Sequence, residues 1–197
     1  PLTSGVSQEL ARWRAGQYRD IRYDIELALQ PGAPRIEGRV EISFHLEHAT
    51  DDLILDWRGN RPEERVRDIE ANGKSVAARF EQDHLLIPAA SLRPGENKIG
   101  LRFYSPISAS SAVVRYIDRE DNNEYLYSLF VPSDASTVFP CFDQPDLKAR
   151  FTLGVTAPER WKIVANSPLT RSTPVGNQLR REFAPTEPIS TYLFAFA

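Results

Sequence analysis

The sequence predicts an all-β fold: an open, saddle-like antiparallel β-sandwich of about a dozen strands with a short N-terminal helix. Two long stretches alternate apolar and polar residues with a period of two, which is typical of strands with one buried face. Many short apolar segments are separated by turn residues, and no helical pattern is interleaved with them. The length of 197 residues corresponds to about one domain.

The only helical pattern lies at the start of the chain. Ser7 can cap a helix that contains Leu10 and Trp13 on one side and ends near Gly16. We therefore divide the chain into a helical lead-in at 1–18 and a β domain at 19–197.

The alternation is strongest at 21–29 and 36–46, which follow each other across the Pro31-Gly32 turn. Asn72-Gly73 lies between two apolar segments and is the strongest short signal for a hairpin. The other expected strands are 53–57, 66–71, 76–80, 84–87, 99–103, 113–117, 125–131, 147–155, 161–165, 179–183 and 191–197.

Composition narrows the possible partners. Lys and Arg number 24 against 27 Asp and Glu, and the two signs alternate along the chain without a basic face. We therefore expect no nucleic-acid partner. No apolar run approaches the ~20 residues that a membrane span needs. The chain starts at Pro1, contains no Met and has a single cysteine. A removed signal peptide or a trimmed chain would explain that start, and we expect a periplasmic or secreted protein in preference to a cytoplasmic one.

The three histidines do not form a metal site by their spacing. His45 and His48 are three apart on an expected strand, which places their side chains on opposite faces. His84 precedes an apolar strand, and we expect a structural role for it. No metal ligands are therefore predicted in this chain.

Two other patterns have simple structural explanations. The segment 118–124 places oxygen ligands at alternate positions as a calcium loop does, but it lacks the glycine and the final Glu of such a loop. We expect a solvated acidic loop there. Cys141 has no basic neighbour in the sequence, and we expect a buried, unreactive thiol.

The segment Phe139-Pro140-Cys141-Phe142-Asp143-Gln144-Pro145-Asp146 predicts a rigid corner before a long strand. Asp143 can form an Asx-turn, and Pro145 fixes its own φ and restricts Gln144 to extended conformations.

This segment closely resembles the Phe-Pro-Cys-Phe-Asp-(Gln/Glu)-Pro motif of the aminopeptidase N family of zinc metallopeptidases. Weaker similarities to the N-terminal domain of that family occur in the same order along nearly the whole chain. They are found at 23–25, 38–40, 66–69, 161–168 and 190–196.

The resemblance implies a module of a zinc aminopeptidase, an enzyme that removes N-terminal residues from peptides. In that family the zinc is bound in the next domain by a His-Glu-x-x-His helix and a later Glu, where water is activated for attack on the peptide carbonyl. A Gly-x-Met-Glu-Asn strand there holds the free amine. None of these motifs occurs in this sequence. We therefore expect no cofactor and no catalytic residue in the fragment, with zinc in the parent protein and the catalytic domain after residue 197.

The resemblance also implies a contribution to the substrate cleft. Many members carry a Gln-x-Gln or Gln-x-Glu pair just before the motif, and these positions fall on Leu129 and Val131 here. Either the second domain alone holds the amine, or Ser133 or Asp134 replaces the pair. The candidates for the cleft wall, to which a peptide substrate would bind in the full-length protein, are Leu129, Phe130, Val131, Ser133 and Asp134.

The motif itself is expected to contact the catalytic domain of the same polypeptide. If so, Phe139 or Phe142 would be partly exposed in the isolated chain. The expected contact residues are Phe139, Cys141, Phe142, Asp143, Gln144 and Pro145. The alternative is a stand-alone β-sandwich that serves as a binding or adhesion module.

Overall fold

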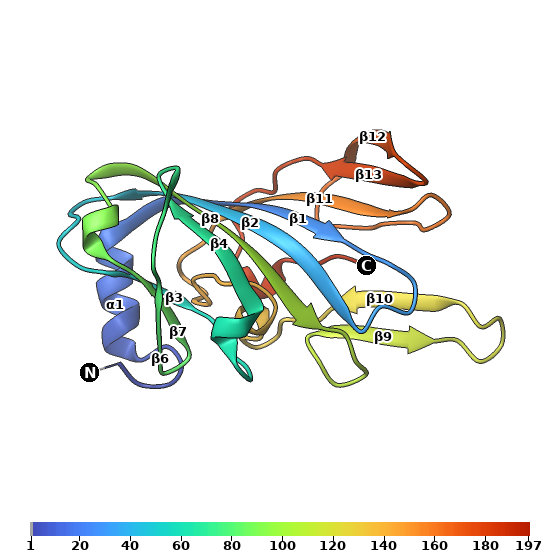
Figure 1. Cartoon of the computed structure of the whole chain (residues 1–197), viewed down its shortest axis with the longest axis horizontal. Helices are drawn as coiled ribbons and strands as arrows, with labels where there is room; N and C mark the ends of the chain where they lie inside the picture. The colour runs from blue at the N-terminus through green and yellow to red at the C-terminus, as the bar shows by residue number, and fades with distance from the viewer. Residues whose placement is uncertain (1) are drawn as a thin grey trace.

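The computed structural model describes residues 2–197, which form one short helix and two layers of β-structure (Figure 1). The helix α1 spans Gln8–Gln17 and leads directly into the first strand. The strands are β1 (Tyr18–Ala28), β2 (Arg35–Leu46), β3 (Leu53–Asp56), β4 (Val66–Ala71), β5 (Lys74–Ser75), β6 (Arg79–Glu81), β7 (His84–Ile87), β8 (Gly95–Pro106), β9 (Val113–Ile117), β10 (Glu124–Ser128), β11 (Arg150–Pro158), β12 (Leu169–Val175) and β13 (Gln178–Phe183). The predicted mainly β fold with a short N-terminal helix is confirmed.

The larger layer is an eight-stranded sheet with the order β12-β13-β11-β1-β2-β8-β4-β5. A three-stranded sheet (β3-β7-β6) and the β9–β10 hairpin form the rest of the β-structure, and no part of the sheet closes into a barrel (Figure 1). Each strand pair among the described residues is antiparallel except β1 and β11, which run parallel from Arg22 opposite Arg150 to Ala28 opposite Thr156. This pair makes the large sheet mixed.

The two long strands β1 and β2 bury one face, as their alternation predicts. On β1 the side chains of Tyr23, Ile25 and Leu27 are buried, while Asp24 between them is exposed and Glu26 is half-buried. The buried faces of the sheet, the three-stranded sheet and the loop segments 130–147 and 189–196 share one continuous hydrophobic core. Burial of apolar surface at about 25 cal/mol per Å² is the main stabilising contribution for such a core.

The helix begins where Ser7 predicts. The Ser7 hydroxyl accepts a hydrogen bond from the Leu10 N–H at 3.1 Å, and Glu9 lies in the first turn, where the helix dipole favours a negative charge. Leu10 and Arg14 are the helical residues that are buried. The helix therefore presents both an apolar and a charged side chain to the interior.

The Asn72-Gly73 hairpin is also confirmed. Both residues have positive φ, 53° and 78°, and they connect β4 to the short strand β5. Asparagine and glycine tolerate this left-handed region better than other residues do.

Four details of the strand prediction are wrong. The expected strand 76–80 is interrupted, because residues 76–78 lie between β5 and β6 and belong to neither. Residues 161–165 form a loop with one isolated bridge, from Ala165 to Phe196. Residues 191–197 begin as a 3-10 helix at Thr191–Leu193 instead of a strand. Strand β12 was not expected, because its seven residues are all exposed and carry no alternation.

No helix within residues 2–197 combines the length and the apolar character needed to cross a membrane.

Candidate functional site

The corner at 139–146 is built into the centre of the domain. The backbone of Cys141 pairs with that of Asp56 at the end of β3: Asp56 N–H donates to the Cys141 carbonyl at 2.7 Å, and Cys141 N–H donates to the Asp56 carbonyl at 3.2 Å. At its other end a turn closes from Leu147 N–H to the Gln144 carbonyl at 3.2 Å. The expected rigid turn is present, and it is joined to the smaller sheet.

Both phenylalanines of the corner are enclosed by other aromatic rings. Phe142 is 0% exposed and lies between Tyr18, with ring centroids 4.8 Å apart, and Phe44, at 6.2 Å. Its backbone N–H donates to the Tyr23 hydroxyl at 2.9 Å. Phe139 is 1% exposed and packs edge-to-face against Tyr23. The expectation that one of these rings would be partly exposed is wrong, because the domain itself supplies their neighbours.

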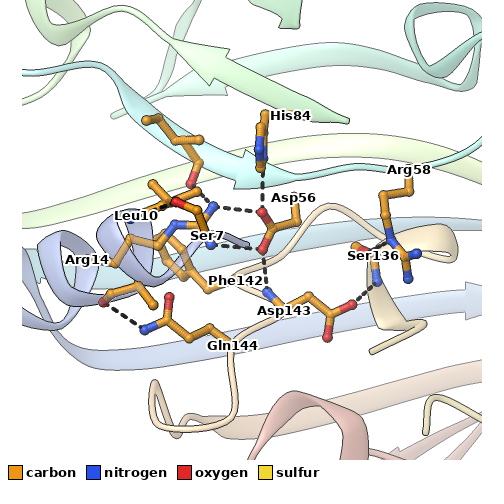
Figure 2. A network of polar contacts seen from close by, with 12 residues as sticks. Ser7, Leu10, Arg14, Asp56, Arg58, His84, Ser136, Phe142, Asp143 and Gln144 are labelled. Atoms are coloured by element: carbon orange, nitrogen blue, oxygen red, sulfur yellow. Dashed lines mark hydrogen bonds and ion pairs between the residues drawn. The ribbon is translucent and has the colours of Figure 1, made fainter. Parts of the chain in front are cut away.

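The buried carboxylate of Asp56, at the end of β3, lies beside the corner at 139–146 (Figure 2). Asp56 accepts two hydrogen bonds from the Arg14 guanidinium, Nη2 to Oδ1 at 2.8 Å and Nη1 to Oδ2 at 2.9 Å. His84 Nδ1 lies 3.0 Å from Oδ1, and the Asp143 N–H donates to Oδ2 at 2.7 Å. Helix α1, strands β3 and β7, and the corner therefore meet at one side chain.

The contacts of Asp56 keep it ionised despite its burial. Burial alone would raise the pKa of Asp56, but His84, the Arg14 guanidinium and the Asp143 N–H together hold that pKa below its ordinary value of 3.8. A buried ion pair of this kind specifies which elements meet more than it adds net stability, since both charges lose their hydration.

Asp143 and Gln144 extend the network in opposite directions. Asp143 Oδ2 accepts from the Ser136 N–H at 3.0 Å. The Asx-turn predicted for Asp143 is wrong, because its donor would be the backbone N–H of Pro145, which proline lacks. Burial and the neighbouring Asp56 raise the pKa of Asp143, although Ser136 opposes the shift. Gln144 Nε2 donates to the Ala11 carbonyl of α1 at 3.0 Å, while its Oε1 is buried without a partner.

The thiol of Cys141 is completely buried. Burial, and then the carboxylates of Asp143 and Asp56, raise its pKa well above the ordinary range. A thiol in such surroundings is a poor nucleophile, because the thiolate is the reactive form.

Of the six corner residues expected to contact another domain, Pro145 is the one whose side chain is exposed. The exposure of Phe139, Cys141, Phe142, Asp143 and Gln144 ranges from 0% to 6%. These five act inside the domain, because each is already enclosed by α1, β3 or the aromatic rings of the large sheet.

The cleft candidates lie on the segment that follows β10, where alternate residues point in opposite directions. Leu129 and Val131 are 53% and 56% exposed, whereas Phe130 between them is 1% exposed. The Phe130 ring packs on Phe139, with centroids 6.0 Å apart, and on Phe194. Phe130 is therefore a core residue and cannot contact a ligand in this fold, which corrects its assignment to the cleft wall.

Leu129, Val131 and Asp134 line a pocket of about 480 Å³. Gly59, Arg65, Val114 and the serines at 110 and 111 complete much of its wall. Three of the five sequence-based candidates for the cleft thus line one pocket, while Phe130 and Ser133 do not. Leu129 and Val131 contribute apolar side chains to a wall that also contains Arg65, Ser110 and Ser111.

Asp134 is already paired with a cation. Its Oδ1 lies 2.9 Å from Arg58 Nη2, and Arg58 also donates to the Ser133 carbonyl and, through Nε, to Ser136 Oγ at 2.9 Å. Ser133 lines a second pocket, of about 230 Å³, together with Arg58, Asp56 and Asp143. Ser133 and Asp134 therefore face different pockets, and Arg58 holds them in place.

Residues 2–197 bring together no group of three or more His, Cys, Asp or Glu side chains that could hold a metal ion. His45 is half-buried on β2 and His48 is exposed in the following loop. At the tip of the β9–β10 hairpin, Asp118 Oδ1 accepts from the Glu120 N–H, and Asp121 Oδ1 accepts from the Asn123 N–H, both at 2.8 Å. These two carboxylates thus support the turn.

The sequence did not single out Arg14, Asp56 or Arg58, and it gave His84 only a general structural role. Their partners are far apart along the chain, so no spacing reveals them. One available signal was a charged residue, Arg14, within the apolar stripe of the helix, since buried arginines are almost always paired.

Comparison with known proteins agrees with the resemblance. Residues 19–193 match the family model described as Peptidase M1 N-terminal domain. An aminopeptidase N from Streptomyces lividans is 35% identical over 198 residues, covering 98% of this chain and 22% of that protein. An aminopeptidase A from Gloydius brevicauda is 28% identical over 90% of this chain and 20% of its own length.

The fold has a solved counterpart as well. The structure of native leukotriene A4 hydrolase from Saccharomyces cerevisiae superposes with a TM-score of 0.74 at 20% identity, covering 92% of this chain and 29% of that one. The chain thus spans about a fifth of the Streptomyces and Gloydius relatives. The family match covers nearly the whole chain, and the chain belongs to the Peptidase M1 N-terminal domain family.

Proposed function

We propose that this chain is the non-catalytic N-terminal domain of a zinc metalloaminopeptidase that removes N-terminal residues from peptides. The observation that carries the proposal is the family match over residues 19–193, together with relatives named aminopeptidase N and aminopeptidase A. In this proposal the zinc is bound by a following domain, which supplies the Lewis acid for peptide hydrolysis. In this proposal the residues of this chain shape part of the substrate cleft and take no part in the chemistry.

The finer part of the proposal concerns the substrate cleft. Leu129 and Val131 would form an apolar portion of the cleft wall, because both are exposed and line the 480 Å³ pocket. Asp134 lies on the same wall, but the Arg58 guanidinium 2.9 Å away already satisfies its charge. This pairing favours the alternative in which the following domain holds the substrate amine. Ser133 faces the other pocket and supports Arg58.

The proposal is tested in the full-length protein by measuring zinc content and hydrolysis of aminoacyl anilides. We expect Asp134→Ala to change KM and kcat only slightly, since its carboxylate is committed to Arg58. We expect Leu129→Gln combined with Val131→Glu to alter KM, because this change places polar groups on the proposed wall. The matched control is Leu169→Gln on β12, which is also exposed, at 51%, but lies at the far edge of the large sheet.

Three outcomes would count against the proposal. A full-length protein that neither retains zinc nor hydrolyses any aminoacyl anilide would contradict the assignment as a whole. Unchanged kinetics in the Leu129/Val131 variant would remove these residues from the cleft. A large loss of activity in Asp134→Ala would instead show that Asp134 takes part in holding the amine.

A further inference from the structure

The exposed apolar side chains of this domain are concentrated on the β9–β10 hairpin. Six of the eleven large hydrophobic side chains that are exposed within residues 2–197 belong to the segment 116–131. Figure 1 shows this hairpin as an arm that projects from the body of the domain. A contiguous exposed apolar surface of this kind marks an interaction site more often than isolated exposed residues do.

The register of the hairpin places its three exposed tyrosines on one face, while the exposed Ile117 lies on the other, opposite Glu124. Tyr125 is opposite Tyr116 and Tyr127 is opposite Val114, so these four residues share a face of the two-stranded sheet. The Tyr116 and Tyr125 rings lie 6.2 Å apart between centroids. The same alternation continues through Leu129 and Val131. We call this surface the outer face; it consists of Val114, Tyr116, Tyr125 and Tyr127, and it is bordered by Leu129 and Val131 of the proposed cleft wall.

The opposite face of the hairpin already packs against the domain. Val113 is 0% and Leu126 is 6% exposed, and Arg115 pairs with Glu124 at 2.7 Å between Nε and Oε1. The hairpin is therefore held firmly from inside, and its aromatic residues point away from the core. A rigid apolar face without a partner in the domain is suited to contact with another folded surface.

The end of the chain lies beside the end of β10. The Ser128 N–H donates to the Phe196 carbonyl at 3.0 Å, and Ser128 Oγ accepts from the Phe196 N–H at 2.9 Å. Ala197 then pairs with Val164 through two backbone hydrogen bonds of 2.8 and 2.9 Å. Polypeptide continuing from Ala197 would start next to the end of β10. At about 3.3 Å per extended residue, a few residues are long enough to reach from there to the outer face.

We propose that the outer face is the docking surface for the domain that follows Ala197 in the longer protein. This inference rests on the proposed function only in that a domain follows. A further domain is a suitable occupant because the chain covers 22% and 20% of two relatives, so most of each of those proteins lies outside the part that this chain matches. The inference also places the interface with the following domain at the outer face, and not at the enclosed corner at 139–146.

The charges around the hairpin disfavour a membrane as the occupant. Its tip carries Asp118, Glu120 and Asp121 against one Arg119. An anionic lipid surface attracts basic segments and would repel this one. The outer face itself contains no charged residue, so the surface that covers it is expected to be apolar in its centre.

Hydroxyl-radical footprinting of tyrosine side chains tests the inference. We expect Tyr116, Tyr125 and Tyr127 to lose most of their reactivity in the full-length protein compared with the 197-residue chain. Tyr104, half-buried on the large sheet, is the internal control and should react equally in both. Equal reactivity of the three hairpin tyrosines in both proteins would overturn the inference. Protection that appears in the short chain alone as its concentration rises would show that a second copy covers the face, and would overturn it too.

A paired substitution separates docking from folding. Tyr116→Ser with Tyr125→Ser should leave the urea midpoint of the short chain unchanged, since both rings are exposed. In the full-length protein the same pair should restore the reactivity of Tyr127 and split one cooperative unfolding transition into two. The control pair Leu169→Ser and Val175→Ser, equally exposed on β12, should do neither. A full-length protein in which the hairpin variant keeps Tyr127 protected would contradict the inference.

Activity measurements keep this inference separate from the proposed function. A full-length protein that hydrolyses aminoacyl anilides but leaves the hairpin tyrosines reactive rejects the docking surface alone. A protein that protects these tyrosines but neither binds zinc nor hydrolyses such substrates rejects the enzymatic assignment alone.

Discussion

The backbone N–H of Asp143 donates to the Asp56 carboxylate at 2.7 Å, and this contact joins the corner at 139–146 to strand β3. The same carboxylate binds Arg14 of α1 and lies against His84 of β7 (Figure 2). One buried side chain thus fixes the relative positions of four segments that are distant in sequence. The corner serves the interior of the domain, and the predictions below begin from that role.

Removing the charge of Asp56 should strongly destabilise the domain. Asp56→Asn leaves the buried Arg14 guanidinium without its anion, a change that typically costs about 3–5 kcal/mol. The measurement is the free energy of unfolding in urea. The control is Glu187→Gln, which removes a carboxylate from an exposed pair with Arg150 and should cost less than about 1 kcal/mol. Equal effects of the two substitutions would contradict the role assigned to Asp56.

Asp143 and Asp56 should contribute to the pH dependence of stability with opposite signs. The pKa of Asp143 is raised above 3.8, so the folded state holds a proton that the unfolded state has lost, and stability falls as pH rises through that folded pKa. The pKa of Asp56 is lowered, so its contribution is present above 3.8 and is lost as pH falls through its folded pKa.

The variant Asp143→Asn isolates the first of these two effects. It keeps a side-chain oxygen for the Ser136 N–H but cannot titrate, so the decline of stability above pH 3.8 should become smaller. The loss of stability at lower pH, which is due to Asp56, should remain. Urea unfolding measured across this pH range checks the prediction. An unchanged decline in the variant would show that another group causes it.

Cys141 should resist alkylation in the native protein. The thiol is fully buried and its pKa is raised, so iodoacetamide should react only as fast as the domain opens. Mass spectrometry over time, with and without urea, measures this rate. Reaction at the rate of a free thiol under native conditions would contradict the buried position.

Adjacent residues on the 129–134 segment should respond oppositely to truncation. Phe130→Ala removes a ring from the aromatic core and should cost about 3–5 kcal/mol. Leu129→Ala, on the exposed side, should change the stability of the isolated domain by less than about 0.5 kcal/mol. The pair of urea denaturation curves provides the check, and similar effects at both positions would contradict the alternation described for this segment.

Much of the fold could be predicted because its signals are local. The alternation of β1 and β2, the Ser7 cap and the Asn72-Gly73 turn each depend on a few neighbouring residues. The pairing of Arg14 with Asp56 could not be predicted, because it joins residues with no relation in sequence. Strand β12 lacks a signal for the opposite reason: no residue on it is buried.

The candidate site was predicted in part for the same reasons. Aligning Leu129 and Val131 with a motif made them candidates for the cleft wall of the full-length protein, and in this domain both line a pocket. Motif position alone could not show that Phe130 points inward, or that Arg58 occupies the carboxylate of Asp134. Both facts depend on the packing of loops against the second layer.

The parallel pairing of β1 with β11 has a consequence for the order in which this domain can be made. The first strand of the sheet has its neighbour on one side only after residues 150–158 have been synthesised. Contacts between such distant parts of a chain slow folding, and a nascent chain leaves its unpaired strand edge open to association until they form. Emergence of β11 from the ribosome is therefore the step at which the β1 edge becomes protected.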